Sequence, residues 1–427
     1  MMLQMNQNQT VIVDRQPVSL AVSDMLQQFT RIWWECSTDL PDLGRTYSLR
    51  EQLQKEKDLD RQLDSLFTEL RTPPQSQEGR LQAQKRIMTT VEAFARAALG
   101  LEEHHIQAIK DYGFIEVLAE FARSARAFDP SISDEDLFQA GRNVWSMNFM
   151  QLMLGQPIRL TPSIFAYSLL YPYTDNYLDD PTVSDLAKHS FNDRFRRRLD
   201  GDDIQPLNPQ EERICRLIEM IEEEFDRHTY PQVYESLLAI FYGQAHSLSL
   251  IKPGASPFEM DVLGICFEKG GTSVLADGYL VNGDLTPDQQ AFMFHYGTLT
   301  QLMDDLEDTR RDLENGLQTV FSMTAQNWPL DQVTNRTIHY AQSFLDHMDT
   351  LDAPAAGPFK DVFRTCLIPV ILGAVGTVEK YYSRSYRRAV QSHFPVRFSF
   401  IEKQRRKLVR RGISAMWVIE AMAEQPE

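Results

Sequence analysis

The chain is short of cysteine, of basic charge and of long apolar runs. It has 4 cysteines in 427 residues, and they form no C-x-x-C pair and have no histidine at zinc spacing. We therefore expect reduced thiols in a cytoplasmic protein, and structural zinc is excluded. The longest apolar run, Cys366 to Val378, is too short to span a bilayer and contains Pro369. It is expected to be a buried core helix.

Basic residues are outnumbered by acidic ones. The 43 Lys and Arg residues against 60 Asp and Glu residues give a formal net charge of −17 at pH 7. This charge argues against nucleic acid or an anionic membrane as the main partner. The first stretch, Met1 to Gln16, has no basic region followed by an apolar core, so no secretory signal is expected.

Runs of alternating β-branched residues are also scarce, and most segments have a helical period, such as Ser48 to Arg71 and Glu211 to His228. Threonine before proline at Thr161 and Thr286 is typical of helix starts. The sequence therefore predicts an all-α protein. Residues 1–130 are more polar and are expected to form a helical appendage to a core formed by residues 131–427.

The helix expected from about Pro287 carries a run of polar and acidic residues on one side. At about 100° per residue they fall within one third of its circumference: Gln301, Asp304, Asp305, Asp308 and Asp312. Further back on that side lie Met293, Phe294, Gly297 and Thr298, which do not form a solvated face. This pattern predicts the wall of a deep pocket with an anionic rim.

A second helix has the same design. Asp175 and Asp179 are one turn apart, Asp180 is adjacent, and Pro181 ends the helix just beyond them. Below them on the same face lie Tyr171, Ser168 and Ile164. A single D-x-x-x-D would be weak evidence in so acidic a chain, but two such clusters predict opposite walls of one site.

Carboxylates without His or Cys select Mg²⁺ or Mn²⁺, and Mg²⁺ keeps waters and adds substrate phosphates. Such ions would tether an anionic diphosphate to an acidic rim, and basic residues should complete the site. The candidates are Lys269, which precedes an expected break at Gly270 and Gly271, and the arginines Arg310, Arg311, Arg384, Arg387, Arg388, Arg194, Arg196, Arg197 and Arg198. Most of these arginines are expected to be solvated surface charges.

These residues resemble a known family. "QLMDDLED", from Gln301 to Asp308, is similar to the Q-x-x-D-D-x-x-D motif of class I isoprenoid synthases, which include trans-prenyl diphosphate synthases and ionisation-dependent terpene cyclases. "DNYLDD" resembles the first aspartate-rich motif in its D-x-x-x-D form, and "EKGGTS" is similar to a diphosphate-contacting motif with two glycines interposed. The resemblance covers about Asp134 to Arg388.

The resemblance implies a helical bundle around a deep apolar cavity. It implies that Asp175, Asp179, Asp304 and Asp308 are catalytic Mg²⁺ ligands, that Asp305 also binds the metal with Gln301 in support, and that Lys269 grips the diphosphate. An allylic prenyl diphosphate, farnesyl or longer, would be ionised to a carbocation in a dry cavity lined by aromatic residues such as Phe294 and Tyr171. Related enzymes are often dimers, so a homodimer is expected.

Departures from the family favour a terpene synthase. The chain has neither the D-D-x-x-D form of the first motif nor a G-G-K-x-x-R-P stretch for a second substrate. The second motif is not the Asn/Ser/Glu triad of many cyclases, so the chain looks more like squalene/phytoene synthase relatives or bacterial large-terpene synthases. It has no D-x-D-D, which argues against protonation-initiated cyclisation.

Three alternatives stay open. The first is a prenyltransferase that condenses two prenyl diphosphates. The second is a di-iron bundle, which needs two Glu-x-x-His pairs, whereas the chain has one, Glu102 to His105. The third is a non-catalytic helical scaffold whose acidic faces are solvated.

Overall fold

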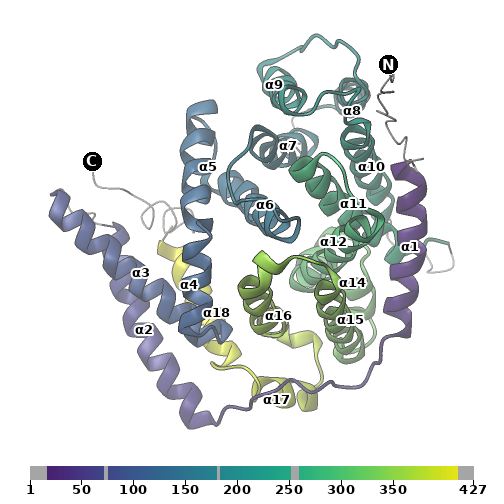
Figure 1. The fold of residues 1–427 in the computed structure, drawn as a ribbon. Helices are drawn as coiled ribbons and strands as arrows, with labels where there is room; N and C mark the ends of the chain where they lie inside the picture. Colours follow the sequence, from purple (N-terminus) through teal and green to yellow (C-terminus); the bar gives the residue numbers. More distant parts are fainter. Residues whose placement is uncertain (1–16, 72–75, 180–182, 252–258, 412–427) are drawn as a thin grey trace, which may run out of the picture.

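The computed structural model describes residues 17–71, 76–179, 183–251 and 259–411, and it is drawn in Figure 1. In these ranges the regular elements are helices and none is a strand. The prediction of an all-α bundle is therefore confirmed. In the same ranges no helix combines the length and the apolarity that a membrane crossing requires.

Helix α11 (Val262–Asn282) runs through the middle of the molecule (Figure 1). It contacts α6 (Asp134–Met153), α7 (Pro162–Asp179), α10 (Pro231–Ser247) and α12 (Pro287–Glu307). A helix that is apolar on nearly every side is stable only when other helices surround it. Helices α6, α7, α11 and α12 thus form the centre of the bundle, and α7, α11 and α12 carry the predicted motifs.

The expected break at Gly270 and Gly271 does not occur, because α11 continues through both residues. The two glycines instead allow α12 to approach. A Cβ atom on Gly297 of α12 would lie 2.2 Å from the carbonyl oxygen of Gly270, and one on Gly271 would lie 2.5 Å from the ring of Phe294. Missing side chains therefore set the distance between these helices.

The predicted helix starts are confirmed. Helix α12 begins at Pro287 behind a capping box, in which Thr286 Oγ1 accepts from the Gln289 N–H and Gln289 Oε1 accepts from the Thr286 N–H. Helix α7 begins at Pro162 and ends at Asp179, before Pro181. Helix α12 ends at Glu307, and after Asp308 the chain continues as α13 (Thr309–Asn315).

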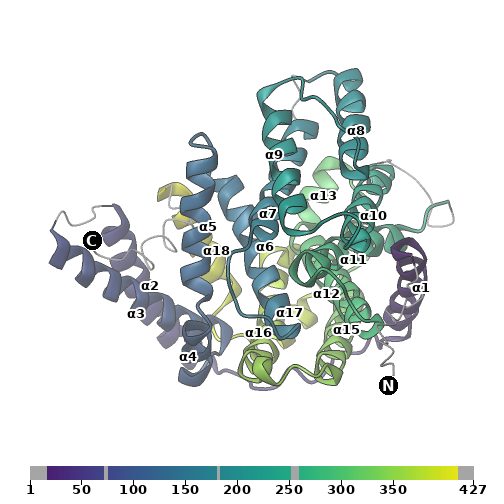
Figure 2. The same cartoon turned by 45° about the horizontal axis from the view of Figure 1, so that its top comes forward.

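The first 130 residues do not pack as one unit. Helix α1 (Val18–Glu35) belongs to the main core, where it contacts α10, α11, α12 and α15 (Asp331–Thr350). Helices α4 (Glu103–Asp111) and α5 (Phe114–Phe128) also join that core. Helices α2 (Leu49–Arg71) and α3 (Gln77–Leu99) project from the bundle as a hairpin in Figures 1 and 2, and they share a small apolar cluster around Phe67.

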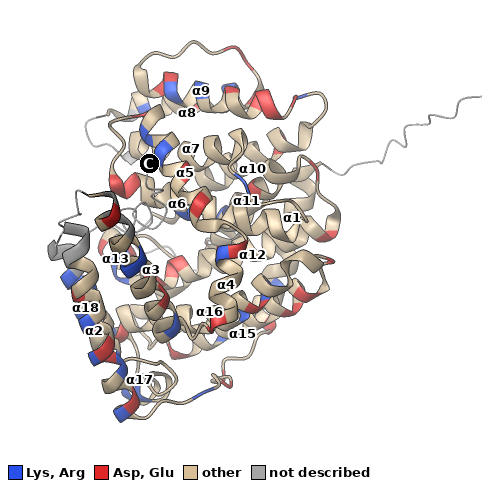
Figure 3. Ribbon diagram, turned by 60° about the vertical axis from the view of Figure 1, so that its left-hand side comes forward, with Lys and Arg blue, Asp and Glu red and all other residues tan. Residues whose placement is uncertain are grey.

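The C-terminal helices close the bundle on the side of α2. The apolar run from Cys366 lies in α16 (Gly357–Thr377), whose Leu367, Ile371 and Val375 are buried as predicted. Arg397, just before α18 (Phe398–Arg411), pairs with Glu56 of α2 at 2.7 Å. Acidic and basic positions alternate along this edge in Figure 3. The short elements are η1 (Leu248–Leu250), α14 (Val320–Ala325), η2 (Pro354–Ala356), η3 (Glu379–Tyr381) and α17 (Arg384–Gln391).

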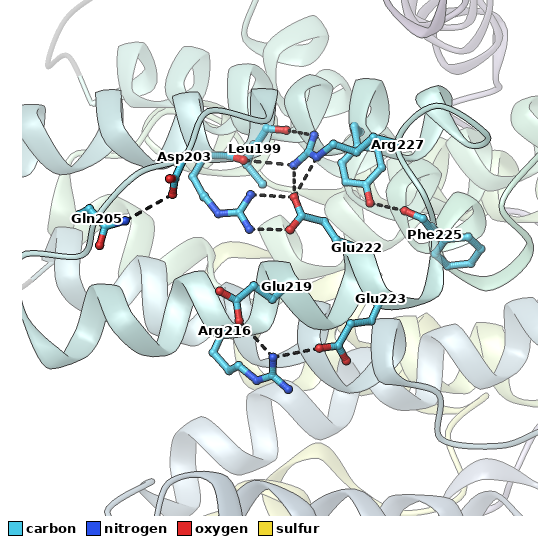
Figure 4. Close-up of polar contacts among 11 residues, drawn as sticks. Leu199, Asp203, Gln205, Arg216, Glu219, Glu222, Glu223, Phe225 and Arg227 are labelled. Carbon is cyan, nitrogen blue, oxygen red and sulfur yellow. Dashed lines mark hydrogen bonds and ion pairs between the residues drawn. The ribbon is translucent and has the colours of Figure 1, made fainter.

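The arginine run of α8 (Asp185–Asp200) joins this helix to its surroundings. Arg198 donates two hydrogen bonds to Glu222 of α9 (Pro209–Glu224), at 2.7 and 2.6 Å, and Arg227 donates to the same carboxylate at 2.8 Å (Figure 4). The other members of the run also form ion pairs: Arg194 with Glu211, Arg196 with Asp193, and Arg197 with Asp202. This run is therefore part of the scaffold. All four cysteines are free thiols, as expected.

Candidate functional site

The acidic stretch at the junction of α12 and α13 divides into an outer and an inner set. Asp304 is exposed and Asp308 is half-buried, whereas Asp305 and Asp312 are each only 5% exposed. Asp304 Oδ1 accepts a hydrogen bond from Arg142 at 3.0 Å, and Asp308 pairs with Arg311. The prediction placed all these carboxylates on one face. In the structure only the outer two face the solvent, because the inner two turn towards the protein interior.

The inner set lies next to Lys269 of α11. Gln301 Nε2 donates to Asp305 Oδ1 at 2.7 Å, while the buried Oδ2 atom has no hydrogen-bond partner. Lys269 acts electrostatically on both Asp305 and Asp312. Burial raises the pKa of Asp305 to about 7. Burial, together with repulsion by Asp305 and Asp308, raises the pKa of Asp312 to about 7. The structure thus brings Gln301, Lys269 and the inner carboxylates together.

These raised pKa values predict that the protein loses stability as the pH rises. The folded state holds protons on Asp305 and Asp312 up to pH of about 7, whereas an unfolded aspartate loses its proton near pH 3.9. The stabilisation of the folded state by each of these bound protons is therefore complete below about pH 4 and is lost by about pH 7. We expect Asp305→Asn to raise the unfolding free energy at pH 8 by roughly 2–4 kcal/mol relative to the wild type.

Urea unfolding at pH 5 and pH 8, in the presence of EDTA, measures this effect. The difference between the two pH values should shrink in Asp305→Asn. It should persist in Asp288→Asn, which removes an exposed carboxylate at the other end of α12. An Asp305→Asn protein with the pH dependence of the wild type would contradict the prediction.

Arg142 of α6 is a candidate site residue that the sequence did not reveal. Its guanidinium contacts Asp304 of α12 and interacts electrostatically with Tyr171 of α7. Since α6 also packs against α7, this ion pair links the end of α12 to the helix next to α7. The only sequence signal is a short polar face on an otherwise apolar helix, where Arg142 and Ser146 are one turn apart.

The wall formed by α7 is described only in part. Position 175 follows Tyr171 by one turn, but Asp180 and the side chains of Asp175 and Asp179 lie outside the described residues. Asn176 donates to Asp136 of α6 at 2.8 Å, and Tyr173 donates to Asp129 at 2.7 Å. The first bond attaches the end of α7 to the start of α6, one to two turns from Arg142, and the second attaches it to the end of α5.

The remaining predicted site residues have different surroundings. Phe294 is fully buried and stacks on Phe29 of α1 with 6.0 Å between ring centroids, so it packs in the core. Arg310 pairs with Glu314 at 2.8 Å and lines a groove of about 680 Å³ with residues of η3 and α18. Arg384 is exposed in the first turn of α17. Among Arg310, Arg311 and Arg384, it is Arg311 that pairs with a carboxylate of the outer set, Asp308.

A buried polar group lies between α6, α7 and α11. Asn143 Nδ2 donates to Ser168 Oγ and to Asp277 Oδ1, each at 3.2 Å. Asp277 is 1% exposed, and its Oδ2 atom has no hydrogen-bond partner. Tyr167 and Tyr296 interact electrostatically with this carboxyl group. The sequence contains one signal for this buried group. Three polar residues, Lys269, Ser273 and Asp277, follow one another at four-residue spacing in an otherwise apolar helix.

The His-containing pattern considered for iron is a helix cap. The backbone N–H of Glu102 donates to His105 Nδ1 at 2.9 Å, so the ring proton is on Nε2, which donates to Asp361 at 2.9 Å. His104 also contacts Asp361, at 3.2 Å, and the three groups lie close enough to surround an ion. In this tautomer, however, His105 Nε2 has no lone pair for a metal. The cluster therefore joins α4 to α16.

No protein-family model matches the chain, and no curated protein has detectable similarity to it. The class of protein that the fold defines is an all-α bundle with a cluster of carboxylates at the end of its central helix α12.

Proposed function

We propose that the protein is a Mg²⁺-dependent class I terpene synthase. It ionises an allylic prenyl diphosphate, farnesyl or longer, and cyclises or rearranges the resulting carbocation. One observation carries the proposal: the outer carboxylate Asp304 pairs with Arg142 of α6, and α6 packs against α7, the helix that carries the other aspartate motif. A basic group of α6 and acidic groups of α12 therefore meet at one end of the bundle, which supports binding of metal ions and diphosphate there.

The donor set fits magnesium. Asp304 and Asp308 offer accessible carboxylate oxygens, and Asp175 and Asp179 are their proposed counterparts on α7. Hard oxygen donors favour Mg²⁺, with Mn²⁺ as a substitute. The bound ions would act as Lewis acids on the diphosphate oxygens and so stabilise the leaving group. Asp305 is an indirect participant, because its buried carboxyl accepts from Gln301 and orients the end of α12.

Basic side chains of the chain would bind the diphosphate itself. Arg142 and Arg311 are exposed beside the outer carboxylates, and Lys269 lies next to the inner ones. As the allylic C–O bond breaks, both bonding electrons stay with the diphosphate, and these cations would stabilise the added charge. Aromatic faces below, among them Tyr171 and Tyr296, would stabilise the carbocation while packed helices exclude water.

The test is diphosphate release from geranyl, farnesyl, geranylgeranyl and longer prenyl diphosphates, each offered alone with Mg²⁺ or with EDTA. Extracted hydrocarbons and alcohols identify the products. We expect Mg²⁺-dependent turnover of one chain length to a terpene. Turnover that begins only after isopentenyl diphosphate or a second prenyl donor is added would make the protein a condensing prenyltransferase. No release under any condition would leave a scaffold.

Removal of Arg142 is expected to weaken substrate binding. A hydrogen bond between charged groups contributes about 1.5–3 kcal/mol, so Arg142→Ala should raise KM by roughly 10- to 100-fold. Arg142→Lys keeps the charge and should recover part of the loss. Steady-state kinetics of diphosphate release measure both variants. A KM unchanged in Arg142→Ala would show that this arginine pairs only with Asp304.

A further inference from the structure

A groove of about 860 Å³ is formed by the end of α1, the start of α11, helix α14 and the start of α15. None of the residues that line it belongs to α6, α7, α12 or α13, so it is separate from the acidic cluster. Cavities of this size accept small molecules. The side chains around the groove indicate which kind of molecule it suits.

Tryptophan is concentrated around this groove. Three of the five tryptophans of the chain line it, namely Trp33, Trp34 and Trp328. Trp34 is 58% exposed and Trp328 is 71% exposed, so both present large aromatic surfaces to the solvent. Met260 and Met323 add flexible apolar side chains to the walls. Exposed aromatic groups that gather around a cavity are typical of a binding site for an apolar ligand.

Arg336 distinguishes this groove from an ordinary apolar one. It is half-buried, and its Cζ atom lies 4.9 Å from the ring centroid of Trp33 and 5.1 Å from that of Trp34. Among the residues that the structure describes, no carboxylate forms an ion pair with it. Burial lowers the pKa of Arg336, whereas a neighbouring carboxylate would raise it. Half-buried arginines elsewhere in the chain, such as Arg194 and Arg198, do pair with glutamates.

The acidic residues of the groove form hydrogen bonds with other groups. Asp261 Oδ1 caps α11 by accepting from the Gly264 N–H at 3.0 Å. Asp331 accepts from the backbone N–H of Ser383 at 3.0 Å and from its hydroxyl at 2.5 Å. The described part of the groove therefore contains a positive charge without a carboxylate partner. A partly buried charge without a partner is unfavourable, and a bound anion would compensate it.

Contacts with the main chain hold Arg336 in place. Its Nε atom donates to the carbonyl oxygen of Cys36 at 3.3 Å, and the adjacent Asn335 donates to that of Thr38 at 2.9 Å. The two terminal nitrogens of Arg336 form no hydrogen bond with the described residues. They present two parallel N–H bonds, which match the two oxygens of a carboxylate. A carboxylate would thus bind without rearranging the arginine.

The charges around the groove also limit the charge of the ligand. Arg336 supplies one positive charge, while Asp261 and Asp331 line the same groove and would repel a multiply charged anion such as a phosphate ester. A monoanion is therefore favoured. Its uncharged part would lie against Trp34 and Trp328, where binding removes apolar surface from water.

We propose that this groove binds a small carboxylic acid with an apolar body, whose carboxylate pairs with Arg336 and whose body packs on Trp34 and Trp328. The inference does not depend on the proposed function, because the groove shares no residue with the proposed diphosphate site. The carboxylate would bind whether or not the protein releases diphosphate.

Isothermal titration calorimetry with the full chain tests the proposal. The probes are β-naphthoate, which has an aromatic body, octanoate, which has an aliphatic one, and the neutral amide of each acid. We expect at least one of the two acids to bind with a Kd below about 1 mM. The acid that binds more tightly should exceed its amide in affinity by about 10- to 100-fold, because the amide lacks the charge that pairs with arginine.

Variants locate the bound acid. Arg336→Gln should weaken binding of the acid by about 10- to 100-fold and leave binding of the amide unchanged. Arg336→Lys keeps the charge but not the two parallel N–H bonds, so it should recover part of the affinity. Trp328→Ala should weaken binding of the acid and of the amide equally. Arg45→Gln is the matched control, because Arg45 also stacks on an aromatic ring, that of Tyr47, but lies outside the groove.

The outcomes can be distinguished. If neither acid binds to the wild type, the proposal is wrong. Equal affinity for an acid and its amide overturns the role of the charge, and acetate that binds as tightly as the larger acids overturns the role of the apolar walls. Unchanged affinity in Arg336→Gln, shown to be folded by circular dichroism, places the acid elsewhere and also overturns the proposal. If that variant does not fold, unchanged affinity in Arg336→Lys has the same meaning.

Discussion

Asp304→Asn is expected to reduce the kcat of Mg²⁺-dependent diphosphate release by about 1,000-fold. A metal ion that stabilises a departing anion contributes several kcal/mol to the transition state, and about 4 kcal/mol corresponds to this factor. Asp304 is the most exposed carboxylate of the α12 cluster that the structure describes, and its ion pair with Arg142 directs it towards α6 and α7. Asparagine keeps the size and one oxygen of the side chain but removes the charge that binds the ion.

Asp175→Asn should have a similar effect, because it would remove a ligand from the opposite wall. The double variant should lose little more than either single variant, since residues that serve one metal cluster act as a unit. Coupled phosphate detection and product extraction measure these losses.

Asp288→Asn provides the control, because it removes one negative charge from the first turn of the same helix. If Asp304→Asn and Asp288→Asn had equally small effects on turnover, the acidic cluster would be a solvated helix end. The proposed function would then be wrong.

Gly297→Ala is expected to lower the unfolding free energy by about 3 kcal/mol or more. The added Cβ atom would lie 2.2 Å from the carbonyl oxygen of Gly270, and backbone atoms cannot rotate away as a side chain can. Helices α11 and α12 would have to separate, and Lys269 would then move away from Asp305. Both stability and diphosphate release should fall, as measured by urea unfolding and by the activity assay.

Gly373→Ala is the matched control. Gly373 lies inside α16, and the nearest atom to an added Cβ is 4.0 Å away on Phe394. Alanine is favoured over glycine inside a helix by about 1 kcal/mol, so this variant should be slightly more stable than the wild type. A Gly297→Ala protein that is also more stable would show that the contact between the two helices adjusts at little cost.

The clustering of carboxylates on α12 and the start of that helix could be predicted from local sequence. Thr286, Pro287 and Gln289 fix the start of α12 through a capping box, which needs no distant residue. The helical period then places Asp304 and Asp308 one turn apart at its end. The same reasoning failed at Gly270 and Gly271, where two glycines suggested a break. Surrounding helices stabilise α11 there, and the glycines serve the contact with α12.

Contacts between residues that are far apart in the sequence could not be predicted in this way. Arg142 meets Asp304 across 162 positions, and Asn143 meets Asp277 across 134. Phe294 was expected near the substrate because its face of α12 is apolar, but it packs against α1, which the sequence had assigned to an appendage. Helical periodicity identifies a buried face without identifying what covers it.

The sequence by itself determined that this protein is helical, where its central helices begin, and which short stretches concentrate carboxylates. Those properties depend on contacts within a few residues, namely hydrogen bonds, caps and helical period. The tertiary structure decided which carboxylates are exposed, which are buried and which arginines pair with the exposed ones. These features depend on the burial and charge of groups that only folding brings together.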